Sequence, residues 1–291
     1  MFFVESSSFF EFLRVRSDSY SLWMKVPDIF ECSFDIAYLA TIFYIGFTMW
    51  KCHGNNKAYT LFSIMCILLG FGDCFQLFPR MYSKIFGLTP RVVSAIGIGN
   101  LITAITMSIF YMIFLEVISV KYKKSLKTTR VIMYILLFAR IVTLLLPQND
   151  WIHNAHNLHV SLIRNAPFIL MGVIIVYLLF VSVYGCPQDD FRFMWLYVVI
   201  SFGCYTPVAL CDLRPMTQAA LMIVKTIAYI KIALVGFQNL KPDQPKEASP
   251  VCNKHIYSSN FDASSFTGIL VAFLLLAALL SDCFNCTVRL N

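Results

Sequence analysis

Long apolar runs follow one another along the chain, separated by short polar stretches. Seven of these runs cover approximately residues 34–50, 59–78, 92–120, 131–147, 166–184, 193–211 and 216–237. An α-helix needs about 20 predominantly apolar residues to cross the hydrocarbon core of a bilayer, with some tolerance. The pattern therefore predicts an all-α fold, a polytopic transmembrane helix bundle with seven spans.

Both ends of the chain depart from this repeating pattern. Residues 1–33 mix aromatic and polar side chains, which favours an N-terminal amphipathic segment lying in the membrane interface. The seven-helix transmembrane domain at 34–237 is followed by a polar linker at 238–265. Residues 266–291 contain an apolar run at about 266–280 and a short tail. This run is either an eighth C-terminal span or an anchor signal that is removed.

Composition supports a membrane protein and excludes a soluble domain. Hydrophobic residues make up 58% of the chain and charged residues 13%, whereas soluble domains contain about 25% charged residues. The net charge of +7 is distributed over short loops, which fits the cytoplasmic side of a membrane better than a nucleic-acid interface. The lipid bilayer is the expected partner, and we expect neither a nucleic-acid partner nor a cofactor.

Lysine and arginine residues in the short loops predict the orientation. The densest cluster follows the third apolar run and consists of Lys121, Lys123, Lys124, Lys127 and Arg130. Cytoplasmic loops carry an excess of such residues, so we place this loop in the cytoplasm and the N-terminus on the extracytoplasmic side. The chain is then an integral, multi-pass membrane protein, in a membrane that the pattern does not identify.

Polar residues within the apolar runs point to a site. An ionisable side chain at the bilayer centre costs at least about 2.5 kcal/mol, so such residues usually face the bundle interior and mark a site or pathway. Counting about 1.5 Å per helical residue from the predicted extracytoplasmic ends places Asp73, Asn100, Arg140 and Lys225 at a similar depth on four helices. We expect these residues to line a pocket that opens to the outside.

The second apolar run adds two residues to this prediction. Gln76 and Arg80 share a helical face with Asp73, so Gln76 should point into the pocket and Arg80 should guard its outer mouth. A purely structural alternative is that Asp73 pairs with Lys225 or Arg140 and fixes the helix register.

Three histidines in the predicted outer loop at 148–164 are candidate metal ligands. His153, His156 and His159 are spaced by three residues, so a helix would place them along one drifting face, where they could share a transition metal. This spacing differs from the four-residue histidine pair of the metalloprotease helix. The alternative, which we adopt, is a solvated interfacial loop without a metal.

Several short stretches resemble a known family. They are 72–73 (GD), 78–80 (FPR), 147–151 (PQNDW), 164–168 (RNAPF) and 221–226 (LMIVKT) with Tyr229. Over about residues 60–237 the chain resembles an uncharacterised family of seven-helix, bacterial-type integral membrane proteins that is common in Gram-positive bacteria. The resemblance implies a seven-helix core and no particular activity. Asn165, in the fourth of these stretches, joins the candidate ligand-binding residues.

A partial resemblance to rhodopsin-like receptors is outweighed by departures. Leu69 with Asp73 resembles that family's sodium-site aspartate motif, and 204–207 (CYTP) resembles its helix-bending motif. The chain has no acidic-Arg-aromatic triplet at the end of the third run and no Asn-Pro-x-x-Tyr in the seventh. Lys225 could form a retinal Schiff base, but Leu221 stands one turn before it in place of an acidic residue. We therefore disfavour this family.

Three functions are compatible with the predicted polar layer. The favoured one is binding or transport of a small polar or anionic-headed ligand of unknown identity in an outward-facing intramembrane pocket. Arg140 and Lys225 would hold the ligand, with Asp73 as their counter-charge. The first alternative is an intramembrane lipid-modifying enzyme, with Asp73 as general base and the outer-loop histidines binding metal or moving protons. The second is a structural membrane protein whose charges hold the helices together.

Overall fold

The computed structural model describes residues 26–52, 56–153, 158–184, 188–210 and 215–240. Within these ranges the chain forms seven α-helices, one 3₁₀ turn and no strand, which confirms the predicted all-α fold. The helices are α2 (Val26–Lys51), α3 (Lys57–Phe86), α4 (Pro90–Lys121), α5 (Lys127–Leu145), α6 (Leu158–Val183), α7 (Met194–Leu210) and α8 (Pro215–Asn239), and the turn is η1 (Pro147–Asn149). Six of the seven helices are long and apolar enough to cross a membrane, and α7 is shorter.

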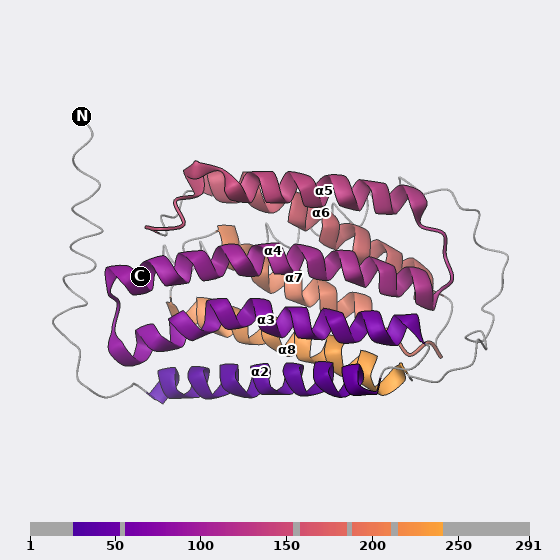
Figure 1. Ribbon diagram of the computed structural model, residues 1–291, viewed down its shortest axis with the longest axis horizontal. Helices are drawn as coiled ribbons and strands as arrows, with labels where there is room; N and C mark the ends of the chain where they lie inside the picture. Colours follow the sequence, from indigo (N-terminus) through magenta and orange to yellow (C-terminus); the bar gives the residue numbers. More distant parts are fainter. Residues whose placement is uncertain (1–25, 53–55, 154–157, 185–187, 211–214, 241–291) are drawn as a thin grey trace, which may run out of the picture.

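The helices run lengthwise in alternating directions and form a closed bundle (Figure 1). Each helix packs against the next one along the chain, and α8 packs against α2, which closes the ring. α4 also contacts α6, where the Tyr111 ring lies 5.4 Å from the Phe168 ring. One end of the bundle contains the start of α4, and we call it the Pro90 end. The opposite end contains the end of α4, and we call it the Lys121 end.

The start of α2 and the end of α3 differ from the predicted spans, for one shared reason. α2 begins at Val26, ahead of the predicted start at residue 34, and α3 continues past Arg80 to Phe86. The additional turns carry charged residues that pair between the two helices, since Lys84 on α3 binds Asp28 and Glu31 on α2. A helix can continue through charged residues that pair with each other, although a prediction from hydropathy alone would end the helix before them.

One predicted loop is partly helical, and three predicted segments lie outside the described residues. The stretch 158–164, expected in an outer loop, is the beginning of α6. The run at 266–280, the polar linker from residue 241 onward and the first 25 residues of the N-terminal segment lie outside the described residues. The eighth span therefore stays a prediction.

The contact between α3 and α4 is close because small residues face each other. The Thr103 hydroxyl on α4 donates a hydrogen bond of 2.8 Å to the carbonyl of Gly72 on α3. Gly99 on α4 lies directly against the Phe75 carbonyl, in space that a β-carbon would occupy. Small residues allow such close approach of transmembrane helices. The same contact fixes the position of Asp73, which follows Gly72.

Candidate functional site

Asp73 lies inside the bundle and is held by a tyrosine of the neighbouring helix. Its residue surface is 6% exposed, and its carboxylate accepts a hydrogen bond from the Tyr38 hydroxyl on α2. Tyr38 is itself buried. The direct partner of Asp73 is therefore this phenol, and within the described residues no lysine or arginine lies within ion-pairing distance of it. The predicted register-fixing ion pair with Lys225 or Arg140 is thus absent from the described structure.

Lys225 on α8 lies near both Asp73 and aromatic residues of α7 and α8. It is 6% exposed, and its charge acts on the Asp73 carboxylate. Its ammonium nitrogen lies 5.4 Å from the centre of the Tyr205 ring and 5.3 Å from that of Tyr229. These are cation–π distances. Lys225 therefore faces the bundle interior, near both an acidic group and two tyrosine rings.

Arg140 on α5 is the most completely buried charged residue described. It is 1% exposed. One guanidinium nitrogen donates to the backbone carbonyl of Arg164 on α6, and the guanidinium carbon lies 5.3 Å from the centre of the Phe168 ring. Its Nε–H is fully buried without a hydrogen-bond partner. Among the described residues no carboxylate lies within ion-pairing distance of this guanidinium.

A short polar chain connects Arg140 with Lys225. The Tyr205 hydroxyl on α7 donates a hydrogen bond of 3.2 Å to the side-chain oxygen of Asn165 on α6, and Tyr205 also acts on the Arg140 guanidinium. Asn165 is buried and donates a second hydrogen bond to the Ser161 hydroxyl at 3.3 Å. Four helices thus bring Arg140, Asn165, Tyr205 and Lys225 into one group, which we call the cationic site.

The Pro90 end of this group is closed by the turn that follows α5. The buried Asn149 side chain donates hydrogen bonds to the carbonyls of Thr143, Leu144 and Leu146 at 2.8, 3.1 and 2.9 Å. The Arg164 guanidinium donates a hydrogen bond of 3.3 Å to the Asn149 side-chain oxygen and lies 4.6 Å from the Trp151 ring. Asn149 and Trp151 of the motif at 147–151 therefore meet Arg164 of the motif at 164–168, although the two motifs are distant in sequence.

Besides Asp73, three of the predicted site residues do not join the cationic site. Gln76 and Asn100 are half-buried, and neither belongs to the hydrogen-bonded chain that contains Asn165. The guanidinium of Arg80 pairs with Glu31 of α2 at 3.2 Å. Their role in ligand binding stays a prediction without support from these contacts.

The histidines of the outer loop are not gathered on one helical face. His153 lies in a turn before α6, His159 lies in the first turn of α6, and His156 is outside the described residues. His153 Nδ1 is 2.7 Å from the Asp150 carboxylate, and this hydrogen bond lowers the pKa of Asp150. No group of three possible metal ligands occurs among the described residues. Because His156 lies outside the described residues, the described structure does not test a metal site formed by the three histidines.

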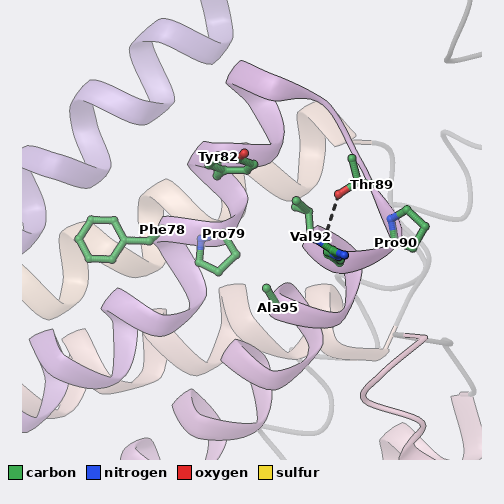
Figure 2. Close-up of a pocket in the computed structure, with 8 residues that line it drawn as sticks. Phe78, Pro79, Tyr82, Thr89, Pro90, Val92 and Ala95 are labelled. Atoms are coloured by element: carbon green, nitrogen blue, oxygen red, sulfur yellow. Dashed lines mark hydrogen bonds between the residues drawn. The ribbon is translucent and has the colours of Figure 1, made fainter.

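An open hollow of about 860 Å³ lies elsewhere on the Pro90 end (Figure 2). Phe78, Pro79 and Tyr82 of α3 and the start of α4 line it. Thr89 caps α4 there through a 3.4 Å hydrogen bond from the Val92 N–H. The lining contains none of the predicted ligand-binding residues. The cationic site therefore does not open into this hollow.

The Lys121 end carries its own polar contacts, which are separate from the cationic site. Arg130 on α5 makes a two-pronged ion pair with Glu116 on α4. Next to α4, the Tyr122 hydroxyl donates a 3.1 Å hydrogen bond to Asp189, and burial raises the pKa of this tyrosine. Burial also lowers the pKa of Lys124, whose ammonium binds Ser182 at 3.1 Å. These contacts join the loops of this end.

Two residues of the site were not predicted from the sequence as ligand-binding candidates. Tyr38 and Tyr205 stand in apolar runs. A tyrosine ring is compatible with the membrane, so its presence in such a run does not indicate a site. Both occur close in sequence or space to a charged residue that was identified, Tyr38 beside Asp73 and Tyr205 beside Lys225. A search for hydroxyl groups able to satisfy each intramembrane charge would have pointed to residues of this type.

Comparisons with protein families, with curated proteins and with solved structures find no match for this chain. The family resemblance drawn from short stretches of the sequence therefore stays a prediction. The function of this protein is therefore inferred from the chemistry of its site.

Proposed function

We propose that this membrane protein binds or transports a small ligand with an anionic head, which the cationic site would hold within the bundle. The ligand would enter from the Pro90 end, which the predicted orientation places outside the membrane. Asp73 would act as counter-charge to Lys225 while the site is empty of ligand.

The observation that carries the proposal is the buried guanidinium of Arg140, which has no carboxylate partner among the described residues and whose Nε–H has no hydrogen-bond acceptor there. Arginine cannot lose its proton in proteins, so its charge persists inside the bundle. A buried charge is costly unless it is paired and hydrogen-bonded. A carboxylate or phosphate group would supply both the charge and the missing acceptor for Nε–H, because the guanidinium fork matches such anions in two-pronged geometry.

The neighbours of Arg140 fit the same ligand chemistry. Lys225 would add a second positive charge, and the Asn165 and Tyr205 side chains would add hydrogen bonds. Aromatic rings of Phe168 and Tyr229 lie beside the two cations and would contact the less polar part of the ligand. Sites of this type combine an apolar wall with a few polar groups that fix the ligand orientation.

A thermal-unfolding experiment tests the proposal. The full chain in nanodiscs of zwitterionic lipid would be heated with acetate, inorganic phosphate or sulfate, each compared with chloride at equal ionic strength. An anion that binds only the folded protein stabilises it by about 2.7 kcal/mol at a hundredfold excess over Kd. We expect at least one of the three anions to raise Tm, and Arg140→Gln to abolish the increase.

Two further variants separate binding from folding. Tyr205→Phe keeps the ring and removes the hydroxyl that bonds to Asn165, so it should fold and bind the effective anion several-fold more weakly. Arg130→Gln, which removes a guanidinium at the Lys121 end, should leave the anion effect unchanged. The proposal is wrong if none of the anions stabilises the wild-type protein, or if Arg140→Gln responds as the wild type does.

A further inference from the structure

A second line of titratable residues runs between α2 and α3 and does not overlap with the cationic site. On α2, Asp28, Glu31, Asp35 and Tyr38 follow one another at spacings of three, four and three residues, which places them on one helical face. On α3, Lys84, Arg80 and Asp73 are spaced by four and seven residues and also share a face. We call these residues the α2–α3 seam. α2 lies beside α3 in Figure 1.

Contacts across the seam begin at the surface of the Pro90 end. The Lys84 ammonium binds Glu31 and lies 3.5 Å from the Asp28 carboxylate, and the Arg80 guanidinium lies 3.2 Å from Glu31. Exposure decreases inward, because the side chain of Asp28 is 34% exposed and that of Glu31 is 14% exposed. The seam therefore leads from water into the bundle.

Asp35 is the next carboxylate along the seam, and it is unpaired. It is 8% exposed, and it makes no ion pair or side-chain hydrogen bond within the described residues. The charges of Arg80 and Asp73 both act on it. The seam has three carboxylates on α2 and two cations on α3, so carboxylates outnumber cations even without Asp73.

The seam ends at Asp73, whose surroundings suit a group that exchanges a proton. α2 presents Tyr38 and Asp35 to it, α8 presents Lys225 and Tyr229, and Cys74 follows it on α3. From α4, the contact beside Asp73 comes from the Thr103 hydroxyl, which binds the Gly72 carbonyl and does not titrate. Intramembrane carboxylates in such chains commonly relay protons.

We infer that the α2–α3 seam carries protons between the Pro90 end and Asp73, with Asp35 as the relay carboxylate. A proton from water adds to a carboxylate oxygen of Asp35 and passes on to an oxygen of Asp73. Asp73 then becomes a neutral carboxylic acid, and Asp35 becomes a carboxylate again. The return path is the same. Tyr38 acts as a positioning residue, because its hydroxyl donates to the Asp73 carboxylate. This inference does not depend on the proposed anion site.

Infrared difference spectroscopy on the full chain tests the inference. Protein labelled with carboxyl-¹³C aspartate, in nanodiscs, would be transferred between neutral and acidic pH in potassium buffer without sodium. All aspartates contribute to the carboxylic-acid absorbance that forms at acidic pH, and we expect one component of it, which we call the band, to be lost in Asp73→Asn. In Asp35→Asn the band should still form, but at least about tenfold more slowly after a pH jump, which corresponds to about 1.4 kcal/mol in the barrier.

Two variants keep the test informative if Asp73→Asn does not fold. Tyr38→Phe retains the ring and removes the donated hydrogen bond, so the band should form at higher pH than in the wild type. Glu116→Gln, at the Lys121 end, should change neither the band nor its rate. The inference is overturned if the band persists in Asp73→Asn, if Asp35→Asn forms it at the wild-type rate, if Tyr38→Phe leaves it unchanged, or if the band responds to sodium and not to pH.

Discussion

Asn149 illustrates how one buried amide closes the end of a transmembrane helix. The last carbonyls of an α-helix have no partner within the helix, and α5 ends at Leu145 without a glycine cap. The Asn149 amide donates to three carbonyls of this end, and its oxygen accepts from Arg164. A single side chain therefore joins α5 to α6 beside the cationic site.

Replacement of this side chain should be costly, although it changes no charge. In Asn149→Ala the carbonyls lose their donor in a buried position, and each unsatisfied group costs about 1–3 kcal/mol. We expect the free energy of unfolding to fall by about that amount, measured by denaturant titration in a mild detergent. Gln148→Ala, at the exposed neighbouring position, should change it by less than about 0.5 kcal/mol. Equal effects of the two substitutions would contradict the capping role.

Single residues also explain which parts of the site could be predicted from the sequence. Asp73, Arg140 and Lys225 stand out because a charge within an apolar run is rare, and all three are buried. Gln76 and Asn100, by contrast, are only half-buried. Their burial could not be predicted, because a helix that is apolar on every side does not indicate which face turns inward. The contacts of Asn149 beside the site could not be predicted, since it reaches α5 and Arg164 only after the turn has folded back.

At the scale of whole elements, the contact between α3 and α4 sets the depth and direction of Asp73. Gly99 lies against the Phe75 carbonyl, one turn from Gly72 and its bond with Thr103. Pro79, four residues after Phe75, has no N–H to donate to that carbonyl. The carbonyl of Phe75 is thus free of its usual helical donor at the point where α4 approaches most closely.

Gly99→Ala should destabilise the protein, against the trend of helix propensity. Alanine favours a helix over glycine by about 1 kcal/mol, but its methyl group would displace the α3 backbone, and overpacking costs about 1–3 kcal/mol. We expect a net decrease in Tm, measured by tryptophan fluorescence. The control Ala95→Ser, at an exposed position one turn earlier, should leave Tm nearly unchanged. A higher Tm for Gly99→Ala would show that the helices are less tightly packed than described.

Element boundaries show why the fold was easier to predict than its details. The apolar runs predicted every helix of the described residues, because crossing a bilayer demands length and apolar composition together. The errors at the start of α2 and the end of α3 come from Glu31 and Lys84, whose mutual pairing is invisible in a one-dimensional hydropathy pattern. Charged turns that neutralise each other extend a helix beyond its apolar core.

For the molecule as a whole, the predicted orientation has a direct test. Cys52 follows α2 at the Lys121 end and is exposed, and the lysine-rich loop at the same end predicts a cytoplasmic location. In a variant that retains this cysteine and has serine at the other nine, a membrane-impermeant thiol reagent should label inverted vesicles and not intact cells. Leu88→Cys in the same background should show the opposite pattern. Labelling of Cys52 in intact cells would contradict the predicted orientation. The Pro90 end, from which ligand and protons are proposed to enter, would then lie on the cytoplasmic side.

The position of Lys225 near both Asp73 and Tyr205 has a thermodynamic consequence. A proton on Asp73 would remove the negative charge that acts on Lys225, and the ammonium would then attract an anion more strongly. Linkage requires the effect to be reciprocal: the anion must strengthen proton binding by the same factor as the proton strengthens anion binding. One lysine would thus make the two occupancies cooperative, and a bundle of this kind would favour loading proton and anion together from the same side.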